Sequence, residues 1–195
     1  MPDTPSITTV KSFSYRGKVE EWGNTYHFSG DTPSNDADWK TLSDALIAQE
    51  KTMMPASVTF TKAYGYVAGN ESSVFQINYA DPPNTVVAGT LAFGSNPRAP
   101  GDAAFWVRWK TSERNTKGRP IYLRKYFHGV VLNTEGDAIL PAQKTAATAY
   151  AGKMTDGTLP GGFKVCGPQG AVAGAALATS FATTRTLKRR GSDPS

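Results

Sequence analysis

Turn-forming residues divide this chain into short segments, and this division limits the folds that it can adopt. Glycine and proline are the strongest local breakers of helices and strands, and the 195 residues include 19 glycines and 13 prolines. Clear turn signals occur at Gly69-Asn70, Asp81-Pro82-Pro83-Asn84, Asn96-Pro97 and Pro100-Gly101. Spacing of this kind is typical of a fold made of many short strands.

Most segments between the turns are rich in β-branched and aromatic residues, which favour strands. The first two expected strands, residues 8–15 and 25–29, flank a polar, acidic loop and form a hairpin. Residues 105–110 alternate apolar with polar side chains, and we expect them to pair with residues 121–131 across a charged loop. The other expected strands are residues 57–67, 73–79, 86–93, 163–166 and 181–187. These segments predict a mainly β, antiparallel domain.

Two segments change to a helical period. Trp39, Leu42 and Leu46 recur at helical spacing, which predicts a helix over about residues 33–54. An alanine-rich segment, about residues 141–155, has proline in its first turn and glycine beyond its end. The fold class is therefore mainly β or α+β, with two helices.

The composition predicts one compact domain without a metal site, a disulfide or a membrane segment. A chain of 195 residues, 39% of them hydrophobic, can bury one substantial core. No stretch approaches about 18 consecutive apolar residues, and the N-terminus lacks the order of a signal peptide. Cys166 is the single cysteine, and two histidines do not complete a zinc motif. We expect one β-rich domain over residues 1–180, a last strand and basic tail over residues 181–195, and no cofactor.

The positive charge is concentrated in two segments. The chain carries a net charge of +5, but residues 106–128 alone hold seven cations against one acid, a local charge of 7 − 1 = +6. The cations of this first cluster are Arg108, Lys110, Arg114, Lys117, Arg119, Arg124 and Lys125. The second cluster closes the chain and consists of Arg185, Lys188, Arg189 and Arg190.

Aromatic residues are interleaved with the first basic cluster. They are Trp106, Trp109, Tyr122, Tyr126 and Phe127. Cations that bind phosphates and flat rings that stack on bases are the two elements of single-stranded nucleic-acid binding. The alternative is a solvated pair of strands without a ligand. We therefore treat both basic clusters as candidate nucleic-acid contacts and expect no catalytic residues.

Two similar segments suggest an internal duplication. Residues 11–67 and 104–166 both read strand, loop, strand, helix, strand, and their second strands carry Tyr26-His27-Phe28-Ser29-Gly30 and Tyr126-Phe127-His128-Gly129. The His27-x-Ser29 pattern resembles half of the paired motif of the two-histidine phosphoesterases, whose fold is duplicated. The second copy lacks the hydroxyl residue, so an enzyme of this kind is only a third reading of the sequence.

Several patches resemble the capsid proteins of small circular, Rep-encoding single-stranded DNA viruses. They are Ser12 to Gly17, Asn24 to Phe28, Tyr122 to Gly129, Cys166 to Gly170 and Thr183 to Gly191. The resemblance implies a coat subunit that assembles with copies of itself into an icosahedral shell around single-stranded DNA. It also implies a jelly-roll-like sandwich and a place in the virion and in the host cell during assembly, including the nucleus of a eukaryotic host.

One feature departs from the pattern of such capsids. They carry a long arginine-rich arm at the N-terminus, whereas residues 1–10 here contain no basic residue. Either the protein lacks the packaging role of that arm, or the role falls to the C-terminal cations Lys188, Arg189 and Arg190. We expect a viral coat protein, with a nucleic-acid-binding protein that forms no shell as the alternative.

Overall fold

The computed structural model describes residues 4–15, 18–54, 58–67, 72–79, 104–128, 141–166 and 182–184. Within these ranges the elements follow in the order β1 Ser6–Tyr15, β2 Lys18–Ser29, α1 Asp36–Lys51, β3 Thr59–Tyr66, β4 Phe75–Asn78, β5 Ala104–Arg114, β6 Pro120–His128, α2 Pro141–Lys153, β7 Lys164–Cys166 and β8 Ala182–Thr184. The 3-10 turn Pro160–Gly162 precedes β7. The strand expected over residues 86–93 lies outside the described residues.

The first sheet is antiparallel and has the strand order β4-β3-β1-β2-β7. β1 lies at its centre and pairs with β2 from Ser6↔His27 to Tyr15↔Lys18. The expected polar loop before residue 25 is therefore wrong, because residues 18–24 continue β2 and pair with β1. Alternation along β1 turns Ile7, Thr9 and Lys11 into the core.

The second sheet has the order β6-β5-β8 and is also antiparallel. β5 and β6 form a hairpin that we call the basic hairpin, residues 104–128. Its first strand, β5, is longer than expected, because pairing continues to Arg114↔Pro120 after an irregularity in the register. The second strand, β6, begins one residue earlier than expected and is described to His128. The tight turn is thus confined to residues 115–119.

The first helix begins where its sequence provides a cap. The side chain of Asn35 accepts a hydrogen bond from the backbone N–H of Asp38, so α1 starts at Asp36, inside the expected range. Its apolar stripe buries Trp39, Leu42 and Leu46, as the spacing predicted. The second helix starts at its proline, as the sequence predicted.

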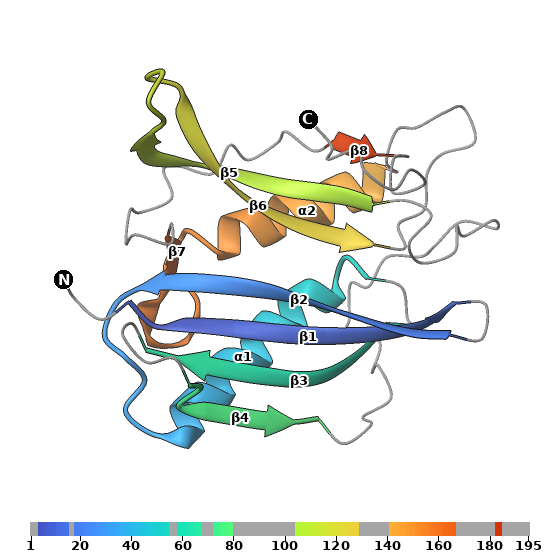
Figure 1. The fold of residues 1–195 in the computed structure, drawn as a ribbon, viewed down its shortest axis with the longest axis vertical. Coiled ribbons are helices and arrows are strands. Elements are labelled where there is room, and N and C mark those ends of the chain that lie inside the picture. The colour runs from blue at the N-terminus through green and yellow to red at the C-terminus, as the bar shows by residue number, and fades with distance from the viewer. Residues whose placement is uncertain are drawn as a thin grey trace.

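The helices cover one side of the sheets. Figure 1 shows α1 behind the five-stranded sheet and α2 behind the basic hairpin, and the buried core residues lie between these layers. The described strands lie side by side in two sheets rather than one sheet stacked over the other, so the jelly-roll-like sandwich is not found here. The expectation of a β-rich α+β domain with two helices is confirmed. No helix in the described ranges has the length and apolar character needed to span a membrane.

The two halves resemble one another in topology. β3-β1-β2 and β8-β5-β6 are both antiparallel triplets in which the hairpin's first strand is central, and a helix follows each hairpin. The strand that follows α2 directly, β7, instead pairs with β2 of the first sheet. The repeated element order is therefore observed, but β8 takes the position that corresponds to β3.

Candidate nucleic-acid interface

The basic hairpin has a buried face and an exposed face, because successive side chains of a strand point to opposite sides. Val107, Trp109 and Phe127 are buried in the core. Between them on the other face lie Arg108, which is half-buried, and Lys110, which is exposed. This alternation places the cations of β5 on the side away from the core.

Two arginines face each other across the hairpin. Arg108 pairs in register with Arg124, and Lys110 pairs with Tyr122. The guanidinium carbon of Arg108 lies 4.9 Å from the ring centroid of Tyr122, a cation–π contact along the diagonal. The register therefore gathers several cations on the outward face of the hairpin.

The turn of the hairpin is held by its own hydrogen bonds. The side-chain oxygen of Asn115 accepts from the backbone N–H groups of Lys117, at 3.0 Å, and Arg119, at 2.9 Å. Arg114 donates from its guanidinium to the carbonyl of Gly118 at 2.8 Å, and Gly118 has φ +71°, which favours glycine. Three further cations are thus exposed around an ordered tip.

The exposed hairpin cations have no acidic partner in the described part of the chain. The ion pairs there are Lys11–Glu50 and Lys40–Asp44. Neither includes one of the five exposed hairpin cations, which are Lys110, Arg114, Lys117, Arg119 and Arg124. Their positive charge is available to an external anion.

Lys125 does not lie where the sequence analysis expected it, among the exposed cations of the hairpin. Its side chain is buried, its ammonium donates to the backbone carbonyl of Thr25 in β2, and it lies 5.1 Å from the ring centroid of Tyr26. Burial lowers the pKa of Lys125 to about 8, the Glu50 carboxylate opposes this effect, and the Lys11 ammonium adds to it. Lys125 joins the basic hairpin to the first sheet and does not belong to the exposed cluster.

Two of the expected stacking residues are also core residues. The indole N–H of Trp109 donates to the carbonyl of Ala151 at 3.2 Å, and its ring lies 5.7 Å from that of Tyr150. Phe127 packs edge-on against the same tyrosine, with ring centroids 5.3 Å apart. These rings attach the hairpin to α2. Tyr122 remains on the outward side, next to Arg108, and Trp106 and Tyr126 pair in register two positions along the hairpin from Arg108↔Arg124.

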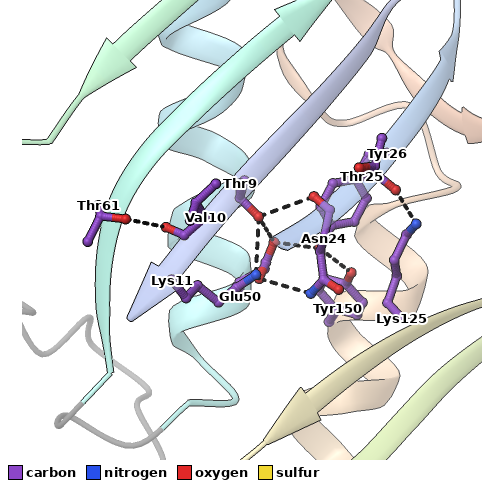
Figure 2. Close-up of polar contacts among 10 residues, drawn as sticks. All are labelled: Thr9, Val10, Lys11, Asn24, Thr25, Tyr26, Glu50, Thr61, Lys125 and Tyr150. Carbon is purple, nitrogen blue, oxygen red and sulfur yellow. Dashed lines mark hydrogen bonds and ion pairs between the residues drawn. The ribbon is translucent and has the colours of Figure 1, made fainter. Parts of the chain in front are cut away.

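A buried polar cluster that the sequence did not lead us to expect lies between the first sheet and α1 (Figure 2). Glu50, in the last turn of α1, accepts from the ammonium of Lys11 at 2.6 Å, the hydroxyl of Thr9 at 2.7 Å, the phenol of Tyr26 at 2.6 Å and the amide of Asn24 at 3.4 Å. Lys11 and Glu50 are both fully buried. The sequence did contain a signal for the burial of both residues. Lys11 lies an even number of residues after Ile7 and so shares its face of the strand, and Glu50 lies one helical turn after Leu46.

Burial also controls the protonation of this cluster. It raises the pKa of Tyr26 well above its usual range, and the Glu50 carboxylate adds to the shift. The pKa of Lys11 is lowered by burial, against the pull of the same carboxylate. Lys11, Thr9, Tyr26 and Asn24 all bond to the Glu50 carboxylate, so the cluster holds β1, β2 and α1 together. These groups satisfy one another and do not form an open binding site.

The two histidines are not brought together as a catalytic pair. His27 lies in β2, opposite Ser6 and Cys166, and burial followed by the charge of Lys125 lowers its pKa. The Ser29 hydroxyl, the other half of the motif, donates to the carbonyl of Lys164 at 3.3 Å. His128 is the last residue of β6, and in Figure 1 that end of β6 lies on the opposite side of the view from β7.

A cavity of about 430 Å³ lies at the start of α1. Its lining comprises Asp31, Thr32, Pro33, Ser34, Asp38, Thr41, Pro160, Gly161 and Phe163. The Asp38 carboxylate accepts from the Ser34 hydroxyl at 2.7 Å and from the side-chain amide of the capping residue Asn35 at 2.9 Å, and its charge favours the first turn of the helix. The described residues contain no group of three or more histidines, cysteines and acids that could hold a metal ion.

The second basic cluster, Arg185, Lys188, Arg189 and Arg190, lies outside the described residues. The strand immediately before it, β8, pairs with β5 from Ala182↔Trp106 to Thr184↔Ala104.

Searches with this chain found no matching protein-family model, no matching curated protein and no matching solved structure. The fold and the charged face of the hairpin therefore define a β-rich α+β domain with a candidate anion-binding surface.

Proposed function

We propose that this protein binds single-stranded nucleic acid on the outward face of the basic hairpin. The observation that carries the proposal is the set of exposed hairpin cations that take part in no ion pair in the described part of the chain: Lys110, Arg114, Lys117, Arg119 and Arg124. Unneutralised cations of this kind attract the phosphate groups of a nucleic acid and form charge-assisted hydrogen bonds with them.

An aromatic residue on the same face of the hairpin supports a single strand as the ligand. Tyr122 is only partly buried and lies beside Arg108. Bases of a single strand are free to stack on such a ring, whereas the bases of a duplex are stacked on one another. The proposal includes no catalytic step.

A double variant tests this proposal. Arg108→Gln with Arg124→Gln removes both charges from the outward face, and we expect at least a tenfold loss of affinity for oligothymidylate in fluorescence anisotropy. The matched control, Lys144→Gln with Lys153→Gln, removes two exposed charges from α2 and should bind like the original chain. Equal binding by both variants, or a preference for duplex DNA over single strands, would contradict the proposal.

The second candidate is the wider role of a viral coat protein. It is supported by the resemblance of the patches named above and by the sheet edges: among the described strands, β4, β7, β6 and β8 each have a single strand neighbour. Edge strands can pair with another copy of a chain, and closed symmetry limits such growth to discrete particles. In this role the protein would occur in the virion and, during assembly, in the host cell.

Self-assembly is tested separately from binding. Sedimentation and electron microscopy of the purified protein, with and without single-stranded DNA, should detect closed particles of uniform size. A monomer at all salt concentrations and pH values, with no particles after DNA is added, would exclude the coat role. The binding proposal would survive that result.

A further inference from the structure

We infer that the five-stranded sheet supplies the base-stacking part of the nucleic-acid site, and that Tyr64 and Tyr66 of β3 stack on bases of the bound single strand. The surface is the face of this sheet that points away from α1. We call it the tyrosine face, and it comprises Thr8, Thr25, Lys62, Tyr64, Tyr66 and Gln76. The inference rests on the proposed function and adds a second surface to the site, on the other sheet.

Alternation along β3 places both tyrosines on the side of the sheet away from the helix. Ala63 and Gly65 are buried, and a Cβ atom added at Gly65 would lie 2.7 Å from the ring of Trp39 in α1. These two residues therefore face α1. Because successive side chains of a strand point to opposite sides, Tyr64 and Tyr66 lie on the other face, where both are partly exposed.

The two tyrosine rings form a pair among smaller side chains. Their centroids lie 6.4 Å apart, with an angle of 39° between the ring planes. On the central strand β1, Ser6 pairs with Tyr66 and Thr8 pairs with Tyr64, and on β4 the exposed Gln76 pairs with Tyr64. The rings are larger than each of these neighbours. Partly exposed rings in such a setting offer flat surfaces on which unpaired bases can stack.

The charge beside the rings suits a phosphate backbone. Lys62 lies two residues before Tyr64 on the same strand, pairs with Asn78 of β4 and is partly exposed. It takes part in neither of the ion pairs in the described part of the chain. Glu21 is an exposed acid of β2, but it lies four residues along the strand from Thr25, a separation of roughly 13 Å. A phosphate next to a base stacked on Tyr64 can therefore contact Lys62.

The tyrosine face and the outward face of the basic hairpin lie on the same side of the molecule. Figure 1 shows α1 and α2 both behind their sheets, so the faces that point away from the helices share the opposite side. β6 lies beside β2, where the ammonium of Lys125 donates to the carbonyl of Thr25.

This arrangement lets one single strand contact both surfaces. Thr25 lies two strand spacings, roughly 10 Å, from Tyr64, and the residue before Lys125 is the exposed Arg124. Phosphates of the strand bind the hairpin cations, and its bases reach the two rings. The tyrosine face thus continues the candidate interface on the hairpin.

The test removes the rings but leaves the hairpin cations in place. Tyr64→Leu with Tyr66→Leu should lower the affinity for oligothymidylate at least about tenfold in fluorescence anisotropy, because stacking on both rings is lost. Its affinity for an abasic oligodeoxynucleotide of the same length, which has phosphates but no bases, should equal that of the original chain.

Two matched variants serve as controls. Tyr64→Phe with Tyr66→Phe keeps the rings and should bind oligothymidylate like the original chain. Lys40→Ala with Thr41→Ala changes two exposed residues of α1, behind the sheet, and should also bind like the original chain. Circular dichroism checks the fold of each variant.

A second measurement uses the original chain and does not depend on the folding of a variant. An oligonucleotide that contains bromodeoxyuridine, irradiated in the complex, should form crosslinks to Tyr64 or Tyr66, which mass spectrometry locates. Crosslinks confined to the basic hairpin would contradict the inference.

The outcomes separate this inference from the proposed function. The inference is wrong if the folded leucine variant binds oligothymidylate as tightly as the original chain, or if it loses affinity for the abasic oligomer to the same extent. Neither result affects the proposed function, provided that Arg108→Gln with Arg124→Gln still weakens binding. If that double variant binds normally, the proposed function and this inference both fail.

Discussion

The phenol oxygen of Tyr26 in β2 lies 2.8 Å from the phenol oxygen of Tyr150 in α2. Because Tyr26 donates its single hydroxyl hydrogen to Glu50 at 2.6 Å, Tyr150 is the donor in the contact between the two tyrosines. A directed chain of hydrogen bonds therefore runs from α2 through β2 to the end of α1. Tyr150 also packs against Trp109 and Phe127 of the basic hairpin, so it joins the hairpin to β2, as Lys125 also does.

Removing the charge at the centre of this cluster should destabilise the fold strongly. Glu50→Gln leaves Lys11 buried without a charged partner, and breaking a buried ion pair in this way costs about 3–5 kcal/mol. The control is Lys40→Gln, which breaks the exposed Lys40–Asp44 pair and should cost less than about 0.5 kcal/mol. Urea denaturation measures both. A similar, small loss in the two variants would show that the buried pair does not stabilise the fold.

The stability of the original chain relative to Lys125→Met should depend on pH. Burial lowers the pKa of Lys125 from its ordinary 10.5 to about 8, so between these values the unfolded chain binds more protons than the folded chain. The free energy of unfolding therefore gains a contribution that rises with pH from about 8 to 10.5. The methionine variant lacks this contribution.

The comparison of the two chains isolates Lys125. Burial raises the pKa of Cys166 to about 11 and also raises that of Tyr26; these groups oppose the rise, but they are present in both chains and cancel in the difference. Urea denaturation at pH 7, 8, 9 and 10 gives the two curves. A difference that stays constant over this range would contradict the burial of Lys125.

Gly65 in β3 should not tolerate a side chain. A Cβ atom added there would lie 2.7 Å from Cε3 of Trp39 and 3.1 Å from Cβ of Phe75, so Gly65→Ala forces α1 away from the sheet. We expect a loss of about 1–3 kcal/mol. Gly152→Ala is the control: no atom lies within 4 Å of the added Cβ, and the helix should gain up to about 1 kcal/mol. In thermal unfolding, we expect a lower midpoint temperature than that of the original chain for Gly65→Ala but not for Gly152→Ala.

Local patterns in the sequence were sufficient to predict the helices and the main hairpin. The spacing of Trp39, Leu42 and Leu46 predicted α1, and the proline at residue 141 predicted the start of α2. These features depend on residues that are close in the chain. The jelly-roll expectation came from a resemblance instead, and the described sheets do not have that arrangement.

The position of each cation relative to the core could not be predicted in the same way. Arg124 and Lys125 are adjacent in the sequence, yet one is exposed and the other buried. The buried one is accommodated because Thr25, about a hundred residues earlier, offers a carbonyl group. Only the arrangement of the two sheets creates that contact. The same holds for Trp109, whose partners Tyr150 and Ala151 lie in α2.

The salt dependence of binding tests the central claim most directly. Each phosphate contact on a single strand contributes about 0.7 to the slope of log affinity against log salt concentration. Replacing Lys110, Arg114 and Arg124 by Gln should therefore reduce this slope by about 2 for oligothymidylate, while Lys40, Lys144 and Lys153 replaced by Gln should leave it unchanged. An unchanged slope in the hairpin variant, with the fold confirmed by circular dichroism, would mean that the outward face of the hairpin does not contact phosphates.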